Sequence, residues 1–246
     1  MNLKKIKNPF GGLVYYKEST TSTMAEAKAN LDSEDINGSI FITDFQSSGI
    51  GRLPGRKWLS KTGDNLMFTL ALNKSYLGHG YVTIPLKAGL ALANTISSLC
   101  NLDTKVKWPN DVVINDKKVS GILCQSNKKT ILIGIGLNVN QVEFDDSISS
   151  NTTSLSLLTG NGFNIEMVLS NFLEEFHRVL NSKDWLDKLN ENLYKAGEIV
   201  DFYVGSPEKN ELVSGTLVGL DKNGKVLIKN SENIESSYIS GEFKFS

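Results

Sequence analysis

The 246-residue sequence predicts an α+β protein, in which a mixed β-sheet with helices is followed by a small β-barrel. Up to about residue 195, β-branched apolar runs alternate with segments whose apolar residues recur at helical spacing. From Glu198 onward the chain changes to short alternating strands separated by turn residues. We therefore expect a main domain over residues 1–195 and a smaller one over residues 196–246.

The N-terminal part predicts strands at residues 13–17 and 39–45, with a helix at residues 24–30 between them. A run of Ser and Thr precedes this helix, and Thr23 with Glu26 fits a capping box, in which two side chains bind free backbone N–H groups. Hydroxyls and N–H groups at a helix start also bind polar or anionic ligands. The residues alone leave both interpretations open.

Residues 46–58 form a loop rich in glycine and positive charge. Three glycines and a proline let the backbone approach a ligand closely, while Arg52, Arg56 and Lys57 supply positive charge beside Trp58. The spacing does not match the phosphate-binding pattern G-x-x-x-x-G-K-S/T. Taken alone, the segment is as compatible with a mobile surface loop as with a ligand-binding loop.

The densest group of chemically useful side chains lies at residues 106–125, where two β-branched runs flank Asn115-Asp116 and predict a hairpin with a two-residue turn. That register places four residues on one face: Asp111, Val113, Lys118 and Ser120. The carboxylate and the ammonium are then diagonal neighbours roughly 7 to 8 Å apart, a gap that suits a ligand or an ion better than a close ion pair. An exposed hairpin with ordinary surface charges is the alternative.

Residues 130–139 are expected to form a buried central strand, in which Gly134 and Gly136 either admit a ligand or are simply tolerated. The other predicted elements of the main domain are a strand at 65–72 and helices at 85–99, 153–158, 165–180 and 183–193. The predicted strands of the second domain are 199–204, 212–220, 225–229 and 234–239, with a turn at 221–224.

Composition excludes several classes of function. A formal net charge of −1 argues against a general nucleic-acid binder, and the two histidines have no metal-ligand spacing around them. The chain has neither a secretion signal nor an apolar run long enough for a membrane span, so we expect no membrane association and a cytoplasmic protein. There is no G-x-S-x-G nucleophile motif, although a Ser-His-Asp arrangement stays open.

Three motifs occur in order: the Gly/Arg loop with its tryptophan, the KWPND sequence at 107–111 followed by K-x-x-G-I-L at 118–123, and GIGLNVN at 134–140. In these the chain resembles the biotin protein ligases (biotin–[acetyl-CoA carboxylase] ligases) from about Ser22 to the C-terminus. The resemblance implies a catalytic domain related to class II aminoacyl-tRNA synthetases and an SH3-like barrel. It also implies that biotin and MgATP form biotinyl-5′-AMP, from which biotin passes to one lysine of a biotin carboxyl carrier domain.

The resemblance also implies roles for individual residues. Lys118 is the principal cation between the biotin carboxylate and the α-phosphate, Arg52 closes over the adenylate, and Lys107 supports the same region. Asp111 either holds Mg²⁺ or helps to deprotonate the incoming lysine. The implied biotin-binding residues are Ser22, Thr23, Gln46, Gly49, Ile50, Arg52, Trp58, Lys118 and Gly121. The implied ATP or adenylate contacts are Arg52, Arg56, Trp58, Asn110, Lys118, Gly134 and Asn138.

Two departures from the family pattern are visible. Many members read G-R-G-R-x-G-R-x-W, whereas Ile50 replaces the first arginine here and Leu53-Pro54 lengthens the loop. We hypothesise that biotinyl-AMP is retained less tightly than in relatives that keep this arginine. Some bacterial members carry an N-terminal DNA-binding domain, but here the first catalytic strand begins near residue 13, so no DNA binding is expected.

Two other functions compete with this interpretation. A lipoate or octanoate ligase or transferase has the same fold but a different Gly-rich loop and no KWPND, and a non-catalytic biotin sensor would bind biotin without consuming ATP. The sequence leaves open whether the protein is a homodimer.

Overall fold

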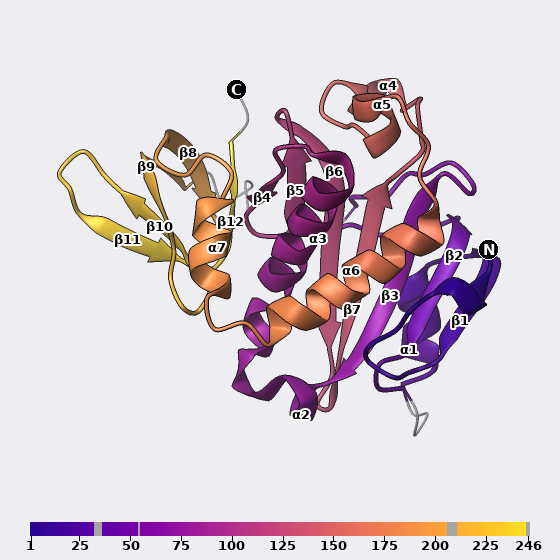
Figure 1. Ribbon diagram of the computed structural model, residues 1–246. Helices are drawn as coiled ribbons and strands as arrows, with labels where there is room; N and C mark the ends of the chain where they lie inside the picture. Colours follow the sequence, from indigo (N-terminus) through magenta and orange to yellow (C-terminus); the bar gives the residue numbers. More distant parts are fainter. Residues whose placement is uncertain (32–35, 54, 206–210, 245–246) are drawn as a thin grey trace.

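The structure is a computed structural model that describes residues 1–31, 36–53, 55–205 and 211–244, with the backbone alone for residues 78–80. Within these residues the main element is a seven-stranded mixed sheet in the order β1-β2-β3-β7-β6-β5-β4 (Figure 1). β1 and β2 run parallel, and the other neighbours are antiparallel. The strands are β1 (Val14–Thr20), β2 (Ile40–Gln46), β3 (Asn65–Asn73), β4 (Lys105–Lys107), β5 (Asp111–Ile114), β6 (Lys117–Ser126) and β7 (Thr130–Asn138).

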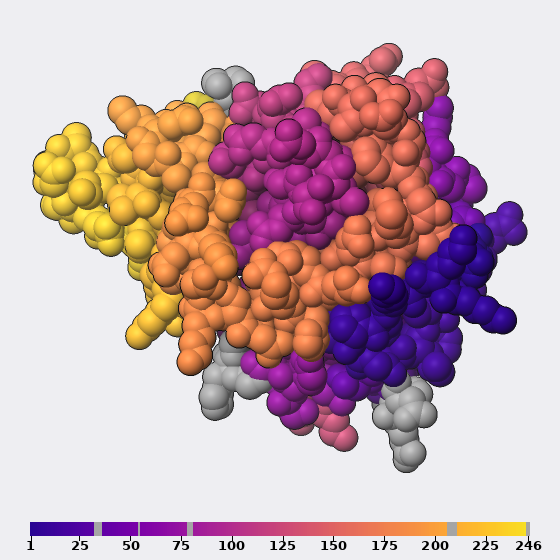
Figure 2. All heavy atoms as spheres, viewed as in Figure 1, coloured from indigo at the N-terminus to yellow at the C-terminus, as the bar shows by residue number. Residues whose placement is uncertain are grey.

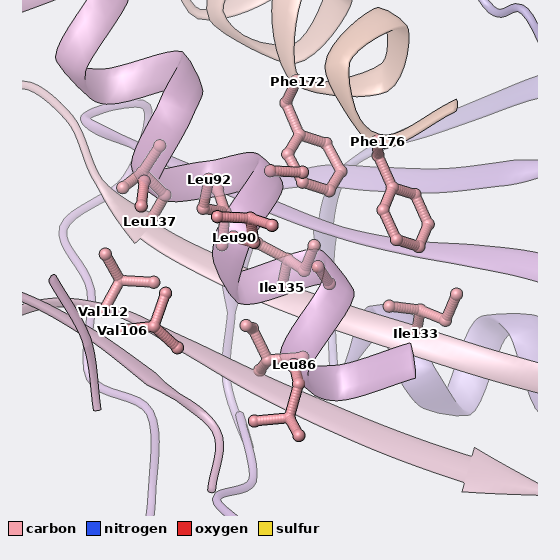
Figure 3. Packing of buried hydrophobic residues seen from close by; sticks show 14 of the residues in the cluster. Leu86, Leu90, Leu92, Val106, Val112, Ile133, Ile135, Leu137, Phe172 and Phe176 are labelled. Atoms are coloured by element: carbon pink, nitrogen blue, oxygen red, sulfur yellow. The ribbon is translucent and has the colours of Figure 1, made fainter. Parts of the chain in front are cut away.

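Helices cover both faces of this sheet. α3 (Ile84–Cys100) and α6 (Ile165–Leu180) pack on one face, where Figure 3 shows Leu90 and Phe172 above Ile135 of β7. α1 (Thr23–Ala29) packs on the other face against β2, β3 and β7. Because strand side chains alternate, Ile133 belongs to the α3/α6 core while Leu132 belongs to the smaller core beneath α1. Gly134 and Gly136 continue the Leu132 face, so that face has room beside α1.

The second sheet is antiparallel, in the order β11-β10-β9-β8-β12. Its strands are β8 (Ile199–Val204), β9 (Leu212–Leu220), β10 (Val226–Lys229), β11 (Glu235–Tyr238) and β12 (Gly241–Phe243). As described, the sheet is open, with β11 and β12 at its two edges. The C-terminal antiparallel sheet confirms that part of the expectation, whereas closure into a barrel stays a prediction.

The two sheets share a continuous apolar core. Trp108 packs against Phe202 and Phe243, with ring centroids 5.7 and 6.4 Å apart, and its Nε1 donates a hydrogen bond to the Gly224 carbonyl at 2.9 Å. Figure 2 shows the yellow C-terminal residues as a lobe at one end of the molecule. The boundary expected after residue 195 falls between α7 (Trp185–Glu191) and β8, but the buried side chains continue across it.

Several boundaries differ from those expected from the sequence. The helix predicted at 153–158 is α5 (Leu155–Thr159), and the strand predicted at 234–239 shortens to β11. α2 (Lys74–Leu77), α4 (Asp146–Ser149) and β12 were not anticipated, because three or four residues are too few to show a hydrophobic period. Among the described residues, no helix is long and apolar enough to cross a membrane.

Candidate active site

Two connected pockets open on the α1 side of the main sheet. The first, here the inner pocket, has a volume of about 70 Å³ and is lined by Ser22, Thr23, Met24, Gln46, Ile50, Gly51, Arg52, Trp58, Thr69, Asn110, Lys118, Gly121, Ile122, Leu123, Gly134, Ile135 and Gly136. The second, here the outer pocket, has a volume of about 260 Å³ and shares Gly51, Arg52, Trp58, Asn110 and Lys118 with the first. It adds Arg56, Lys107, Asp111 and Glu242. Most of the predicted site residues therefore converge on one place.

The start of α1 supplies the polar end of the inner pocket. Gln46 Oε1 accepts hydrogen bonds from the Thr23 backbone N–H at 2.8 Å and from the Thr23 hydroxyl at 3.2 Å. The Thr69 hydroxyl, which belongs to no sequence motif, donates to Thr23 Oγ1 at 2.9 Å. This linked set of hydroxyl and amide groups can donate to and accept from a ligand.

The predicted capping box is wrong. Ser22 is the N-cap of α1 and accepts from the Met24 N–H, whereas the Glu26 carboxylate binds Lys17 Nζ at 2.6 Å and the Thr20 hydroxyl at 2.5 Å. Because Lys17 and Thr20 lie on the neighbouring strand, tertiary contacts outcompete the local cap. The Thr23 side chain is therefore available to the pocket.

The floor of the inner pocket depends on glycine. A Cβ at Gly136 would lie 2.4 Å from Cε2 of Trp58, and one at Gly121 would lie 3.1 Å from Lys118 Nζ. The Trp58 ring therefore rests directly on the β6–β7 backbone. Its Nε1 is buried and has no hydrogen-bond partner among the described residues, so the ring presents an unused donor. Gly136 was noted in the sequence but not assigned to the site, although its alternation with Gly134 was a signal for it.

The 106–125 hairpin places Lys118 between the two pockets. Asn115 and Asp116 have φ values of 49° and 62°, as a two-residue hairpin turn requires, and the predicted pairing of Val113 with Lys118 is confirmed. The expected diagonal gap is wrong, since Lys118 Nζ lies 2.6 Å from Asp111 Oδ1 in a close ion pair.

A register shift explains another difference in this hairpin. The shift between Val112 and Val113 pairs Asp111 with Gly121 and Val112 with Ser120. Ser120 is therefore fully buried on the opposite face, where its hydroxyl donates to the Gly136 carbonyl, and the prediction that it shares the Lys118 face is wrong. Gly121 takes that place and makes room for the Lys118 side chain.

The side chains of two predicted site residues, Asn110 and Asn138, bind backbone carbonyl groups. The Asn110 amide donates to the Ile122 carbonyl at 2.8 Å, which fixes Asn110 against β6 at the pocket edge. Asn138 is 2 % exposed, lines neither pocket and donates to the Thr153 carbonyl. Since the Thr153 N–H donates to the Lys118 carbonyl, Asn138 supports the strand that carries the lysine. Its predicted contact with the adenylate stays a prediction.

The Gly/Arg loop folds back on itself, with Trp58 N–H donating to the Gly49 carbonyl and Gly51 N–H to the Arg56 carbonyl. Gly49 is buried behind Trp58, whereas Ile50 lines the mouth of the inner pocket and is 46 % exposed. Of the two residues that lengthen the loop, Leu53 is described and Pro54 lies outside the described residues.

The loop arginines contact β12 of the second sheet. Arg56 Nη2 lies 2.9 and 3.1 Å from the two carboxylate oxygens of Glu242, and Arg52 Nη2 donates to the Gly241 carbonyl at 3.5 Å. Sequence reasoning missed Glu242, because it is 186 residues from Arg56 and belongs to no motif. The outer pocket is therefore built from both sheets.

Lys107 is the most deeply buried cation of the site, at 6 % exposure. Burial lowers its pKa to about 8, and the nearby Lys118 and Lys195 act in the same direction. Asp111 and Glu242 oppose this shift. An anion arriving beside Lys107 would favour its charged form.

Comparisons with known proteins agree with the geometry. The family model described as the biotin/lipoate A/B protein ligase family matches residues 15–140. A biotin protein ligase from Aquifex aeolicus, solved in complex with biotin and ATP, is 31% identical, with a TM-score of 0.82 over 94% of this chain and 97% of that one. The bifunctional ligase/repressor BirA of Bacillus subtilis is 27% identical over 93% of this chain and 73% of its own length. The biotin–[acetyl-CoA-carboxylase] ligase of Mycobacterium tuberculosis is 30% identical over 55% and 52%.

Proposed function

We propose, because this chain belongs to the biotin/lipoate A/B protein ligase family, that it is an ATP-dependent biotin protein ligase. It joins the biotin carboxylate to the α-phosphate of ATP, releases pyrophosphate, and transfers biotin from biotinyl-5′-AMP to a lysine of a biotin carboxyl carrier domain. The observation that carries this proposal is the position of Lys118, which lines both the inner and the outer pocket. A cation at that junction can offset the repulsion between the carboxylate and the phosphate.

Biotin occupies the inner pocket in this account. Thr23 and Gln46 offer donors and acceptors for its ureido group, and Trp58 covers its apolar rings, while Gly121 leaves space beneath them. The pocket as it stands is well below the roughly 300 Å³ of a typical ligand site. The Gly/Arg loop must therefore open when biotin enters, and it closes again over the product with Trp58 back in place.

ATP occupies the outer pocket. Arg52, Arg56 and Lys107 surround the position of its phosphates, and Lys118 reaches the α-phosphate from the biotin side. Arg56 exchanges the Glu242 carboxylate for a phosphate, because one guanidinium fork serves either anion. Asn110, Gly134 and Asn138 remain the proposed supports of the adenylate.

The site fits Mg²⁺ only if one carboxylate of the protein and the substrate phosphates coordinate the ion together. No cluster of three His, Cys, Asp or Glu side chains that could hold a metal occurs among the described residues, and Asp111 is the carboxylate beside Lys118. Asp111 would therefore hold Mg²⁺, which supplies neutralising charge on the phosphates when bound.

In the second half-reaction a carrier lysine attacks the acyl carbon of biotinyl-5′-AMP, and AMP leaves. That amine must lose a proton, and Asp111 would accept it at Oδ2. Asp111 Oδ1 lies 2.6 Å from the Lys118 ammonium, which also stabilises the charge on the leaving AMP.

The arrangement of the two sheets supports further parts of this proposal. The order and antiparallel pairing of β8 to β12 support an SH3-like barrel, and a mixed sheet backed by α3 and α6 supports a relation to class II aminoacyl-tRNA synthetases. We keep the division at residue 195 and a cytoplasmic location as further parts of the proposal.

Carrier labelling tests this function directly. Purified protein is incubated with MgATP, biotin and a biotin carboxyl carrier domain, and pyrophosphate release is read together with the intact mass of the carrier. We expect a mass increase of one biotin with the wild type. Lipoate in place of biotin should give no labelling, and labelling by lipoate would move the protein to the other branch of the family.

A further inference from the structure

A third cavity lies behind the active site. It has a volume of about 320 Å³ and opens between the edge strand β4 and the second sheet. Its wall includes three lysines, Lys107, Lys195 and Lys244, together with Tyr194 and Asp201. We call this cavity the lysine pocket.

The charges of the lysine pocket are not balanced by its own acid. Asp201 is the carboxylate among the lining residues, and it already accepts a hydrogen bond from the Ser214 hydroxyl at 2.5 Å. Lys107 and Lys195 both lie over the Tyr194 ring, with Nζ 5.8 and 5.6 Å from its centroid. The Tyr194 ring is therefore a common neighbour of two ammonium groups.

This wall is also connected to the active-site hairpin. Lys195 lies in the turn that follows α7, with a φ of +62°, and lines the pocket. The Tyr194 hydroxyl donates to Asp116 Oδ1 in the turn of the active-site hairpin at 2.8 Å, and this contact fixes the ring between the hairpin and the cavity. The wall is thus tied directly to the hairpin that carries Lys118.

The lysine pocket and the outer pocket have a common wall. Lys107 and Phe243 line both cavities. Four charged groups influence the pKa of Lys107. Asp111, Glu242 and Lys118 line the outer pocket, and Lys195 lines the lysine pocket. Its ammonium is therefore the electrostatic link between the place where ATP reacts and the cavity behind it.

We propose that the lysine pocket is a binding site for inorganic pyrophosphate leaving the outer pocket, a proposal that rests on the adenylation reaction proposed above. A compact polyanion suits a cavity with three ammonium groups and one acid that is already hydrogen-bonded. Adenylation produces such an anion on the far side of Lys107. A site here binds the anion on its way out of the outer pocket and, by microscopic reversibility, on its way back to the adenylate in the exchange reaction.

An acidic side chain of the carrier domain is a different occupant with similar charge. The shared wall at Lys107 favours pyrophosphate, because this anion is generated next to it. Two measurements separate these occupants. Loss of a pyrophosphate site changes pyrophosphate exchange in the absence of carrier, whereas loss of a carrier site changes only the transfer step.

The test is biotin-dependent exchange of labelled pyrophosphate into ATP, measured without carrier over a range of pyrophosphate concentrations. The variants are Lys195→Gln and Lys244→Gln, alone and together. The matched control is Lys222→Gln, which removes an exposed lysine from the β9–β10 turn of the same sheet. We expect the half-saturating pyrophosphate concentration to rise about threefold in each single variant and about tenfold in the double variant, with the control unchanged.

The KM for biotin separates a binding role from a structural one. A tenfold effect on pyrophosphate with biotin KM within twofold of wild type supports the proposal. Equal pyrophosphate dependence in the double variant and the control would overturn it, as would a raised KM for the carrier as the sole effect. Absence of exchange in the wild-type protein would instead overturn the proposed adenylation itself.

Discussion

Gly136 is the residue on which the shape of the inner pocket depends most directly. Its missing Cβ is the space that the Trp58 ring occupies, with an ideal Cβ only 2.4 Å from Trp58 Cε2. Backbone atoms of β7 cannot retreat, because β7 pairs with β3 on one side and β6 on the other. A side chain here must therefore displace the tryptophan.

We predict that Gly136→Ala weakens biotin binding by at least tenfold, because the displaced indole no longer covers the ligand. Titration calorimetry with biotin measures the loss. Gly162→Ala is the control, since nothing lies within 4 Å of its Cβ position. Equal affinities for the two variants would mean that the ring plays no part in holding biotin, and a thermal melt of each variant shows whether the fold is intact.

Side-chain chemistry was easier to predict than side-chain distance. Motif spacing selected Lys118, Asp111 and Arg52, and all three line the outer pocket. The separation of Lys118 from Asp111 was wrong because the long Lys118 side chain extends over Gly121 and reaches the carboxylate. Thr69 was missed because it reaches the site only through pairing of β3 with β7.

At the scale of elements, the contact between the Gly/Arg loop and β12 controls access to the arginines. Glu242 occupies Arg56 with both carboxylate oxygens, and its side chain is only 16 % exposed. In the proposed binding mode, ATP competes with this carboxylate for the guanidinium. β12 therefore holds the loop in place before the nucleotide arrives, at some cost in nucleotide affinity.

We predict that Glu242→Gln lowers the KM for ATP by up to about fivefold, which corresponds to about 1 kcal/mol for a partly exposed ion pair. Steady-state pyrophosphate release at varied ATP measures it. Glu235→Gln, at an exposed position of β11, serves as the control and should behave like the wild type. A higher KM for ATP in Glu242→Gln would show instead that the carboxylate prepares Arg56 for phosphate.

Elements with a clear period were predicted well, and short ones were not. The apolar spacing of α6 and the alternation of β7 gave their positions within one residue at most ends. β12 has three residues and no period, yet it carries Glu242 and forms part of the outer pocket. One part of the site that the sequence could not predict is therefore built by a strand too short to show a pattern.

At the scale of the whole molecule, the second sheet is a wall of the active site. Trp108 of the KWPND motif lines the outer pocket and packs against Phe202 and Phe243, and its Nε1 donates to the Gly224 carbonyl. One apolar core extends through this contact, so the outer pocket and the lysine pocket both lie at the junction of two sheets. Motif resemblance predicted two units, but the way they enclose a site follows only from their packing.

In the proposed reaction Lys118 joins the two substrates at the junction of the pockets. The most direct measurement is a single turnover of purified protein with biotin and MgATP, without carrier, in which biotinyl-5′-AMP is quantified by mass spectrometry. Lys118→Ala is compared with Lys117→Ala, which removes the exposed neighbouring lysine of the same hairpin. We predict that Lys117→Ala forms the intermediate at the wild-type rate and that Lys118→Ala forms it at least a hundredfold more slowly, a loss of about 2.7 kcal/mol. Equal rates in the two variants would contradict the account.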